Sequence, residues 1–129
     1  MKPETSKFLA KARELIHRAP ALLAQDFTDE AGRAAYFAGF HAAQALIFER
    51  TGRSSKTHIG VQAEFARLVR GEPIVDQELR AFLGRAYNPK AVADYESGPG
   101  SKVSAVRAAE AIASAARLIE AVEMLIAPA

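Results

Sequence analysis

The chain has 129 residues, half of them apolar and a quarter charged, with a formal net charge of +2 at pH 7. This length is sufficient for a single domain, residues 1–129, with a core of its own. Because there is no cysteine, disulfides, thiolate nucleophiles and cysteine zinc sites are excluded. The charged start and the lack of a long apolar run argue against a signal peptide or membrane span, so we expect a cytoplasmic protein.

The first predicted helix is marked by apolar residues that recur at three- and four-residue spacing between Phe8 and Ala19. Thr5 or Ser6 is its predicted N-cap, because a hydroxyl oxygen can accept a hydrogen bond from a free N–H group of the first turn. Pro20 lacks an N–H group and clashes with the preceding turn. We therefore expect Pro20 to kink this helix or to split it.

A second helix, the longest, is predicted to start with Thr28 as its cap and to run to about Arg50, with Gly52 as the stop. Acidic residues in its first turn complement the helix dipole. Tyr36 and His41 fall on the edges of its apolar face, where a polar tip can reach a cleft or a neighbouring helix. The face itself consists of Phe37, Phe40, Ala43, Ile47 and Phe48.

Two shorter helices are predicted after a polar connector. Thr57 or Ser55 is the expected cap of the third helix, which residues 71–73 should end. Asp76 is the expected cap of the fourth helix, and Pro89 should terminate or bend it. Apolar residues share one face of each helix: Val61, Phe65, Leu68 and Val69 in the third, and Leu79, Phe82, Leu83 and Tyr87 in the fourth.

The clearest loop, residues 97–101, precedes a last helix predicted from about Val103 to Ala127. This helix is rich in alanine between Ala105 and Ala116. Small side chains let helices approach closely, so we expect it to lie centrally between other helices or at a subunit contact. No segment has the sustained alternation of a strand. The sequence therefore predicts an all-α bundle with five helical segments.

No complete catalytic or cofactor motif is present in the chain. Gly98-Pro99-Gly100 lacks the lysine and the preceding strand of a phosphate loop, and the isolated histidines give no metal-ligand spacing, so we expect no cofactor and no metal. Polar side chains gather instead at two helix ends. A lysine beside free N–H groups can hold a phosphate, although plain capping explains the same residues. These residues are Lys56, Thr57 and His58 at the start of the third helix, and Lys90, Asp94 and Tyr95 after the fourth.

His41 lies in the middle of the second helix, between Phe40 and Ala42. Two interpretations of this position are open. His41 is either a buried histidine that bonds a nearby polar group or a residue of a functional site. Gln44, one turn further along the helix, is the candidate polar neighbour in the first interpretation.

Three separate segments resemble the motifs of small prokaryotic HEPN-domain proteins. Tyr36-Phe37-Ala38-Gly39-Phe40-His41-Ala42-Ala43 is similar to their Tyr-Tyr-Ala-x-Phe-His-Ala-Ala signature. Lys56-Thr57-His58-Ile59-Gly60-Val61 resembles their Lys-Thr-His-x-Gly-Val segment, and Phe65 matches a later phenylalanine. Ala93-Asp94-Tyr95 matches the Ala-Asp-Tyr after their fourth helix. The order and spacing of the three segments agree, and the resemblance spans roughly residues 6–127.

This resemblance implies an antiparallel bundle of four to five helices that forms a homodimer. Family roles include RNA-cleaving toxins, partners of small nucleotidyltransferases in toxin–antitoxin pairs, and modules that bind nucleotides or RNA. In the nuclease branch, an arginine is followed four to six residues later by a histidine in the late helices. Here no histidine lies between Arg80 and Ala129, so we expect a binding module rather than an enzyme.

Other positions also depart from the family pattern. Lys90 stands where the similar branch has arginine, and lysine lacks the two-pronged geometry for phosphate. Ala34 stands where an arginine usually precedes the signature, and Arg33 is one residue away, about 100° round the helix. Arg53 precedes His58 by the nuclease spacing, but in the wrong part of the fold. With Lys56, these two residues are the best local candidates for phosphate contact.

The favoured hypothesis is a dimeric HEPN module that binds a nucleotide or RNA, or that docks a small nucleotidyltransferase. It predicts that six residues converge on one groove, with Tyr36 or Tyr95 available to stack a base. The catalytic residues are unknown in this hypothesis. The six residues are His41, Lys56, His58, Lys90, Asp94 and Tyr95.

Two alternatives remain open. The first is a metal-independent ribonuclease with a shifted site, in which His41 or His58 is the base and the electrophile is a cation: Arg33, Arg53 or Lys90. The second is a structural or interaction bundle with no ligand. In that case the motif residues would hold the bundle and its dimer together, and His41 would be buried and hydrogen-bonded.

Overall fold

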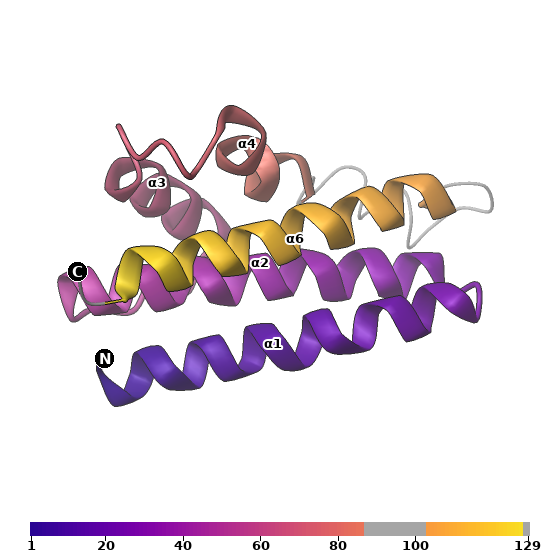
Figure 1. Cartoon of the computed structure of the whole chain (residues 1–129), viewed down its shortest axis with the longest axis horizontal. Coiled ribbons are helices and arrows are strands. Elements are labelled where there is room, and N and C mark those ends of the chain that lie inside the picture. Colours follow the sequence, from indigo (N-terminus) through magenta and orange to yellow (C-terminus); the bar gives the residue numbers. More distant parts are fainter. Residues whose placement is uncertain (87–102, 128–129) are drawn as a thin grey trace.

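A computed structural model gives the fold and describes residues 1–86 and 103–127. Within these ranges the chain forms five helices and no strand, which confirms the predicted all-α class (Figure 1). The helices are α1 (Pro3–Ala24), α2 (Thr28–Thr51), α3 (His58–Leu68), α4 (Gln77–Ala86) and α6 (Ala105–Ile126). None of the helices in these ranges is long and apolar enough to cross a membrane.

The three long helices lie side by side, and the short helices α3 and α4 pack against them (Figure 1). Helix α1 runs antiparallel to α2, whereas α6 runs parallel to α2. Hydrogen bonds at both ends fix this direction. Asp29 Oδ1 accepts from the Val103 backbone N–H at 2.8 Å near the starts of α2 and α6, and the Arg50 guanidinium donates to the Leu125 carbonyl at 3.1 Å near their ends.

Helix α2 is the centre of the fold, because it contacts α1, α3, α4 and α6. Alanine fills most of its contact positions, and small side chains allow four neighbours to approach at once. Tyr36 reaches a neighbouring helix, as predicted, through the hydrogen bond between its hydroxyl and His58 of α3. Tyr36 is only 4% exposed, because α2 is covered on several sides rather than one. The fully buried alanines of α2 are Ala31, Ala35, Ala38, Ala42, Ala43 and Ala45.

Helix α6 packs against α1, α2 and α4, as its small residues predict for a central helix. Ala108 and Ala115 are fully buried, whereas Val106 and Met124 are exposed. Ion pairs link its outer edge to two neighbours: Arg13 of α1 pairs with Glu123, and Arg117 pairs with Asp76 at the start of α4. The subunit contact of this helix stays a prediction.

Two predicted caps in the first two helices were wrong, and the first helix is not split at Pro20. Helix α1 begins at Pro3 rather than after a Thr5 or Ser6 cap, because proline suits the first helical position, where its missing N–H group is not needed. The helix also continues through Pro20 to Ala24 and is not split. Pro20 is exposed and lies in the last turns of the helix, where it removes few hydrogen bonds. Phe27, not Thr28, is the N-cap of α2.

Three other predicted helix ends were confirmed, whereas α3 ends at Leu68, before the predicted stop at residues 71–73. Gly52 ends α2 in the left-handed region with φ of 72°. Thr57 Oγ1 caps α3 by accepting from the Gly60 N–H at 2.9 Å, and Asp76 Oδ1 accepts from the Leu79 N–H at 2.9 Å before α4. Tyr87 and Pro89 lie outside the described residues.

Candidate functional site

Two of the three motif segments meet in one cluster of rings, which we call the aromatic–histidine cluster. It consists of Tyr36, Phe37, Phe40 and His41 from α2 and His58 from α3. Both histidine rings contact both phenylalanine rings: the centroid of His58 lies 5.1 Å from Phe40 and 6.0 Å from Phe37. The corresponding distances from His41 are 5.8 and 6.3 Å. The structure therefore brings the two motif histidines to the same pair of rings.

His58 is held by the start of α3. A hydrogen bond joins its Nδ1 atom to the hydroxyl of the buried Tyr36. The cap at Thr57 fixes the direction of this first turn, and it requires glycine at position 60. A Cβ atom on Gly60 would lie 2.6 Å from Thr57 Oγ1 and 2.7 Å from Ser55 Oγ. The Lys-Thr-His-x-Gly pattern thus has a local structural cause: threonine caps, glycine makes room, and histidine reaches α2.

His41 is held by a different pair of hydrogen bonds. The Gln44 side-chain Nε2 donates to the Ser55 carbonyl at 2.8 Å, and Gln44 Oε1 lies 2.7 Å from His41 Nδ1. A carbonyl can only accept, so the amide nitrogen must face Ser55 and the amide oxygen must face His41. Nδ1 of His41 therefore carries a proton and donates. In the neutral ring, the Nε2 atom is left as an acceptor.

Burial is the main reason that the pKa of His41 lies below its usual value of 6.5. The hydrogen bond to Gln44 opposes this shift, while the positive charge of Lys11 adds to it. The ring of Phe8 on α1 also stacks on His41, with centroids 6.5 Å apart. At neutral pH, His41 is therefore an uncharged imidazole whose Nε2 lone pair is available to accept a hydrogen bond.

His41 lines a groove of about 290 Å³ between α1 and α2, which we call the α1–α2 groove. Its surface is mainly apolar, and cationic side chains from both helices stand beside it. Arg33 is exposed and, within the described residues, has no ion-pair partner. The groove is lined by Leu15, Arg18 and Leu22 of α1 and by Glu30, Arg33, Ala34, Phe37 and His41 of α2.

A second hollow, of about 320 Å³, lies where α2 passes into α3. It is more polar than the α1–α2 groove, and Arg53 is its exposed cation. Arg67 also lines it but pairs with Glu64. We call it the α2–α3 hollow. Its lining residues are Ile47, Thr51, Arg53, Ser54, Ser55, Gly60, Glu64 and Arg67.

Comparison with known proteins places this arrangement in a family. The family model of the HEPN domain matches residues 5–125. The chain belongs to the HEPN-domain family. It is similar to the Methanocaldococcus jannaschii protein named "Putative toxin MJ0142", with 29% identity over 96 residues. The match covers 74% of this chain and 65% of that protein, so the chain spans just under two thirds of its relative's length.

Five of the eight predicted binding residues of this HEPN domain lie in the described ranges, and they do not share one site. Tyr36 and His58 lie in the aromatic–histidine cluster, and His41 lies both there and in the α1–α2 groove. Arg53 lines the α2–α3 hollow, and Lys56 is exposed just before α3. The remaining three predicted residues lie outside the described residues, so convergence of the whole set on one groove stays a prediction. These are Lys90, Asp94 and Tyr95.

Sequence reasoning foresaw Gln44 as the polar neighbour of His41 but missed three contributors to the site of this HEPN domain. Phe8 and Arg18 reach it from α1, and Ser55 accepts the hydrogen bond that orients Gln44. The spacing of His41 and Gln44 within one helix is visible in the sequence. The three missed contacts depend on how separate helices pack. In the described ranges, no three histidine, aspartate or glutamate side chains gather as metal ligands do.

The lowered pKa of His41 predicts a pH dependence of stability. Because the unfolded chain binds a proton on this ring at a higher pH than the folded chain does, the free energy of unfolding should fall as pH decreases from 7 to 5. The shifted carboxylates Glu49, Glu64 and Asp76 start from usual values of 4.5 or below, so their contribution is lost at more acidic pH. Urea unfolding at several pH values measures this slope.

The matched comparison for this measurement is His41→Gln against the exposed His17→Gln. His41→Gln should flatten the slope between pH 7 and 5, because the half-buried ring whose pKa is lowered is gone. His17→Gln should leave the slope as in the unsubstituted protein. If His41→Gln retains the full slope, the proposed neutral state of His41 in the fold is wrong.

Proposed function

We propose that this HEPN protein is a binding module of a toxin–antitoxin-type system and that its ligand is a nucleotide or an RNA strand. The observation that carries this proposal is the aromatic–histidine cluster, with exposed cations close to His58 in the sequence. Aromatic rings stack on bases, and cations neutralise phosphates. Phe37 is only half-buried, and Lys56 and Arg53 are exposed near His58 in the sequence. The cluster thus offers a ring, and the connector before α3 offers the cations.

The toxin–antitoxin role draws on the comparison with known proteins. The Methanocaldococcus jannaschii relative bears the word toxin in its name, and the chain belongs to the HEPN family. The resemblance to small prokaryotic HEPN proteins implies a small nucleotidyltransferase as partner. We propose a homodimer with such a partner, which the family resemblance supports. The net charge of +2 is compatible with an acidic ligand, but it is too small to attract RNA over a large surface.

Binding should be detected as a rise in the thermal unfolding midpoint with AMP or a short single-stranded RNA, and the rise should shrink as salt increases. The double variant Arg53→Ala/Lys56→Ala should reduce the rise, because it removes two cations near the cluster. Lys7→Ala/Arg70→Ala removes the same charge from exposed positions elsewhere and serves as the control. If neither ligand gives a saturable, salt-sensitive shift, the proposal fails.

A metal-independent ribonuclease is the second candidate, and one observation favours it. The Nε2 atom of His41 is an uncharged acceptor in a groove that also contains Arg33. Such a pair could take a proton from a ribose 2′-hydroxyl and stabilise charge on the phosphate. Loss of RNA cleavage in His41→Ala and His58→Ala, with folding retained, would support this candidate. Retained cleavage in both variants would exclude it.

A further inference from the structure

We propose that the α1–α2 groove holds one nucleotide unit, with its phosphate on Arg33, its base or ribose on Phe37, and an N–H or O–H group of the ligand donating to His41 Nε2. This inference rests on the proposed function and adds the place and orientation of the ligand. The unit belongs either to a free nucleotide or to an RNA strand, since both present the same groups.

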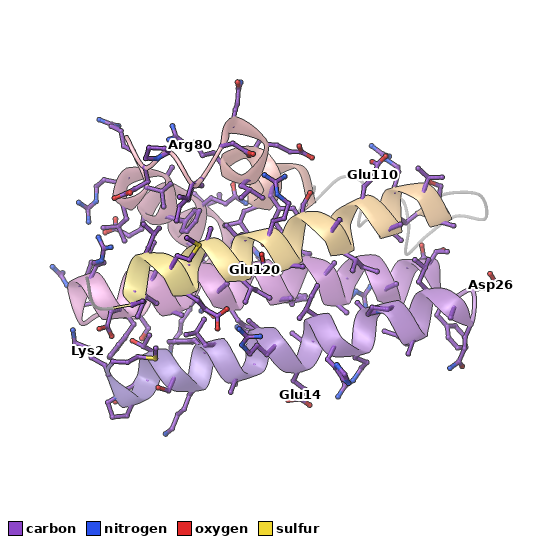
Figure 2. All side chains as sticks on the ribbon, in the orientation of Figure 1. Lys2, Glu14, Asp26, Arg80, Glu110 and Glu120 are labelled. Atoms are coloured by element: carbon purple, nitrogen blue, oxygen red, sulfur yellow. The ribbon has the colours of Figure 1, made fainter. Side chains whose placement is uncertain are left out.

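The phosphate position follows from the charges along the groove. Arg33 is exposed and has no ion-pair partner in the described ranges, so its guanidinium is available for a two-pronged contact with phosphate. Arg18 of α1 also lines the groove, but its guanidinium donates to Glu14 at 3.0 Å. Figure 2 shows Glu14 on the outer side of α1, away from α2. Glu30 lies one turn before Arg33 and would repel a phosphate placed beside it, so we place the phosphate on Arg33 itself.

The opposite end of the groove selects for a hydrogen-bond donor. His41 Nδ1 already donates to Gln44, so the neutral ring can only accept at Nε2. Inorganic phosphate or a simple carboxylate at neutral pH offers poor donors or none. A nucleotide supplies ribose hydroxyls and base N–H groups. Between the two ends, Phe37 with the aliphatic side chains Leu15 and Leu22 provides an apolar surface for a ring.

The dimensions of the groove suit a ligand of this size. The five lining residues of α2 share one side of the helix, and Arg33 and His41 are eight residues apart on it. At about 1.5 Å per residue, their Cα atoms are separated by about 12 Å along the helix axis. The volume of about 290 Å³ lies at the lower end of ligand pockets. One nucleotide unit therefore fits better than a base-paired helix.

The test is isothermal titration of the full chain with AMP, with an RNA tetramer of adenosine, and with inorganic phosphate. Arg33→Ala should raise the Kd of whichever adenosine ligand binds by about tenfold, the loss expected for a charged hydrogen bond. Arg107→Ala on α6 removes the same charge from another exposed site and should leave the Kd within about twofold. His41→Phe keeps an aromatic ring but removes the acceptor, so it should also weaken binding.

Each outcome separates this inference from the proposed function. Weakened binding in Arg33→Ala supports binding in the α1–α2 groove. Binding of AMP then indicates that the natural ligand is a free nucleotide, and binding of the tetramer alone indicates an RNA strand. If binding survives in Arg33→Ala and Arg18→Ala but is lost in Arg53→Ala/Lys56→Ala, the ligand does not bind in the α1–α2 groove, and the proposed function stands. If inorganic phosphate competes as well as AMP, the proposed hydrogen bond from the ligand to His41 Nε2 is wrong. If neither adenosine ligand binds, both proposals fail.

Discussion

Replacing Gly39 with alanine is expected to lower the free energy of unfolding by about 1–3 kcal/mol, although alanine is the better helix former. A Cβ atom at this position would lie 2.4 Å from Cε1 of Phe82 and 3.4 Å from Cδ2 of Leu118. Phe82 is 3% exposed, so its ring has no free space in which to move. The extra methyl group must therefore displace α4 from α2 and α6. Urea unfolding monitored by circular dichroism measures the loss.

Gly32→Ala provides the matched control, because Gly32 lies in the same helix with Val103 no closer than 3.7 Å to the added atom. There the substitution should stabilise the protein by about 0.5–1 kcal/mol through helix propensity alone. Combining Gly39→Ala with Phe82→Leu should lose less than the two single losses added together, because the smaller side chain leaves room. Equal effects at Gly32 and Gly39 would contradict the close packing of α4 on α2.

The second large effect is expected for Gln44→Leu. This substitution keeps the size of the side chain but replaces the amide with an apolar group and removes both of its hydrogen bonds. Gln44 is 6% exposed. Without it, the half-buried His41 Nδ1–H group and Ser55 carbonyl lose their partner, and the loss of two hydrogen bonds costs about 1–3 kcal/mol. Gln77→Leu, at the exposed first position of α4, should change stability by less than about 0.5 kcal/mol.

A spectroscopic measurement distinguishes this role of Gln44 from simple packing. In the unsubstituted protein, the 15N spectrum of neutral His41 should show a protonated Nδ1 and an unprotonated Nε2. Gln44→Leu removes the acceptor that selects this form, so the proton should shift to a mixture of the two nitrogens. If His41 keeps the same single form in Gln44→Leu, its state is not set by Gln44.

Much of the fold was predictable because local chemistry decides it. Gly52, Thr57 and Asp76 mark helix ends by mechanisms that act within one turn, and all three do so in the structure. The wrong predictions concern positions where two local signals compete. Pro3 at the first helical position took precedence over the hydroxyl of Thr5, whose Oγ1 instead donates to Glu49 at 2.9 Å. Such long-range partners are not visible in a single sequence.

The candidate site was predictable only in part, for the same reason. The resemblance to HEPN motifs pointed to His41 and His58, but not to the rings of Phe37 and Phe40 as the surface that they share. Arg18 reaches the α1–α2 groove only because of how α1 packs on α2. Neither helix carries a local signal for that packing.

The central claim is that the ligand binds beside the aromatic–histidine cluster. The most direct measurement is a titration of 15N-labelled protein with AMP and with the adenosine tetramer, followed by NMR. The side-chain signals of His41 and His58, assigned with His41→Gln and His58→Gln, should shift and saturate together with the backbone signal of Phe37. The exposed His17 serves as the internal control and should not move. Saturable shifts confined to residues away from the cluster, or no saturable shift with either ligand, would contradict the claim.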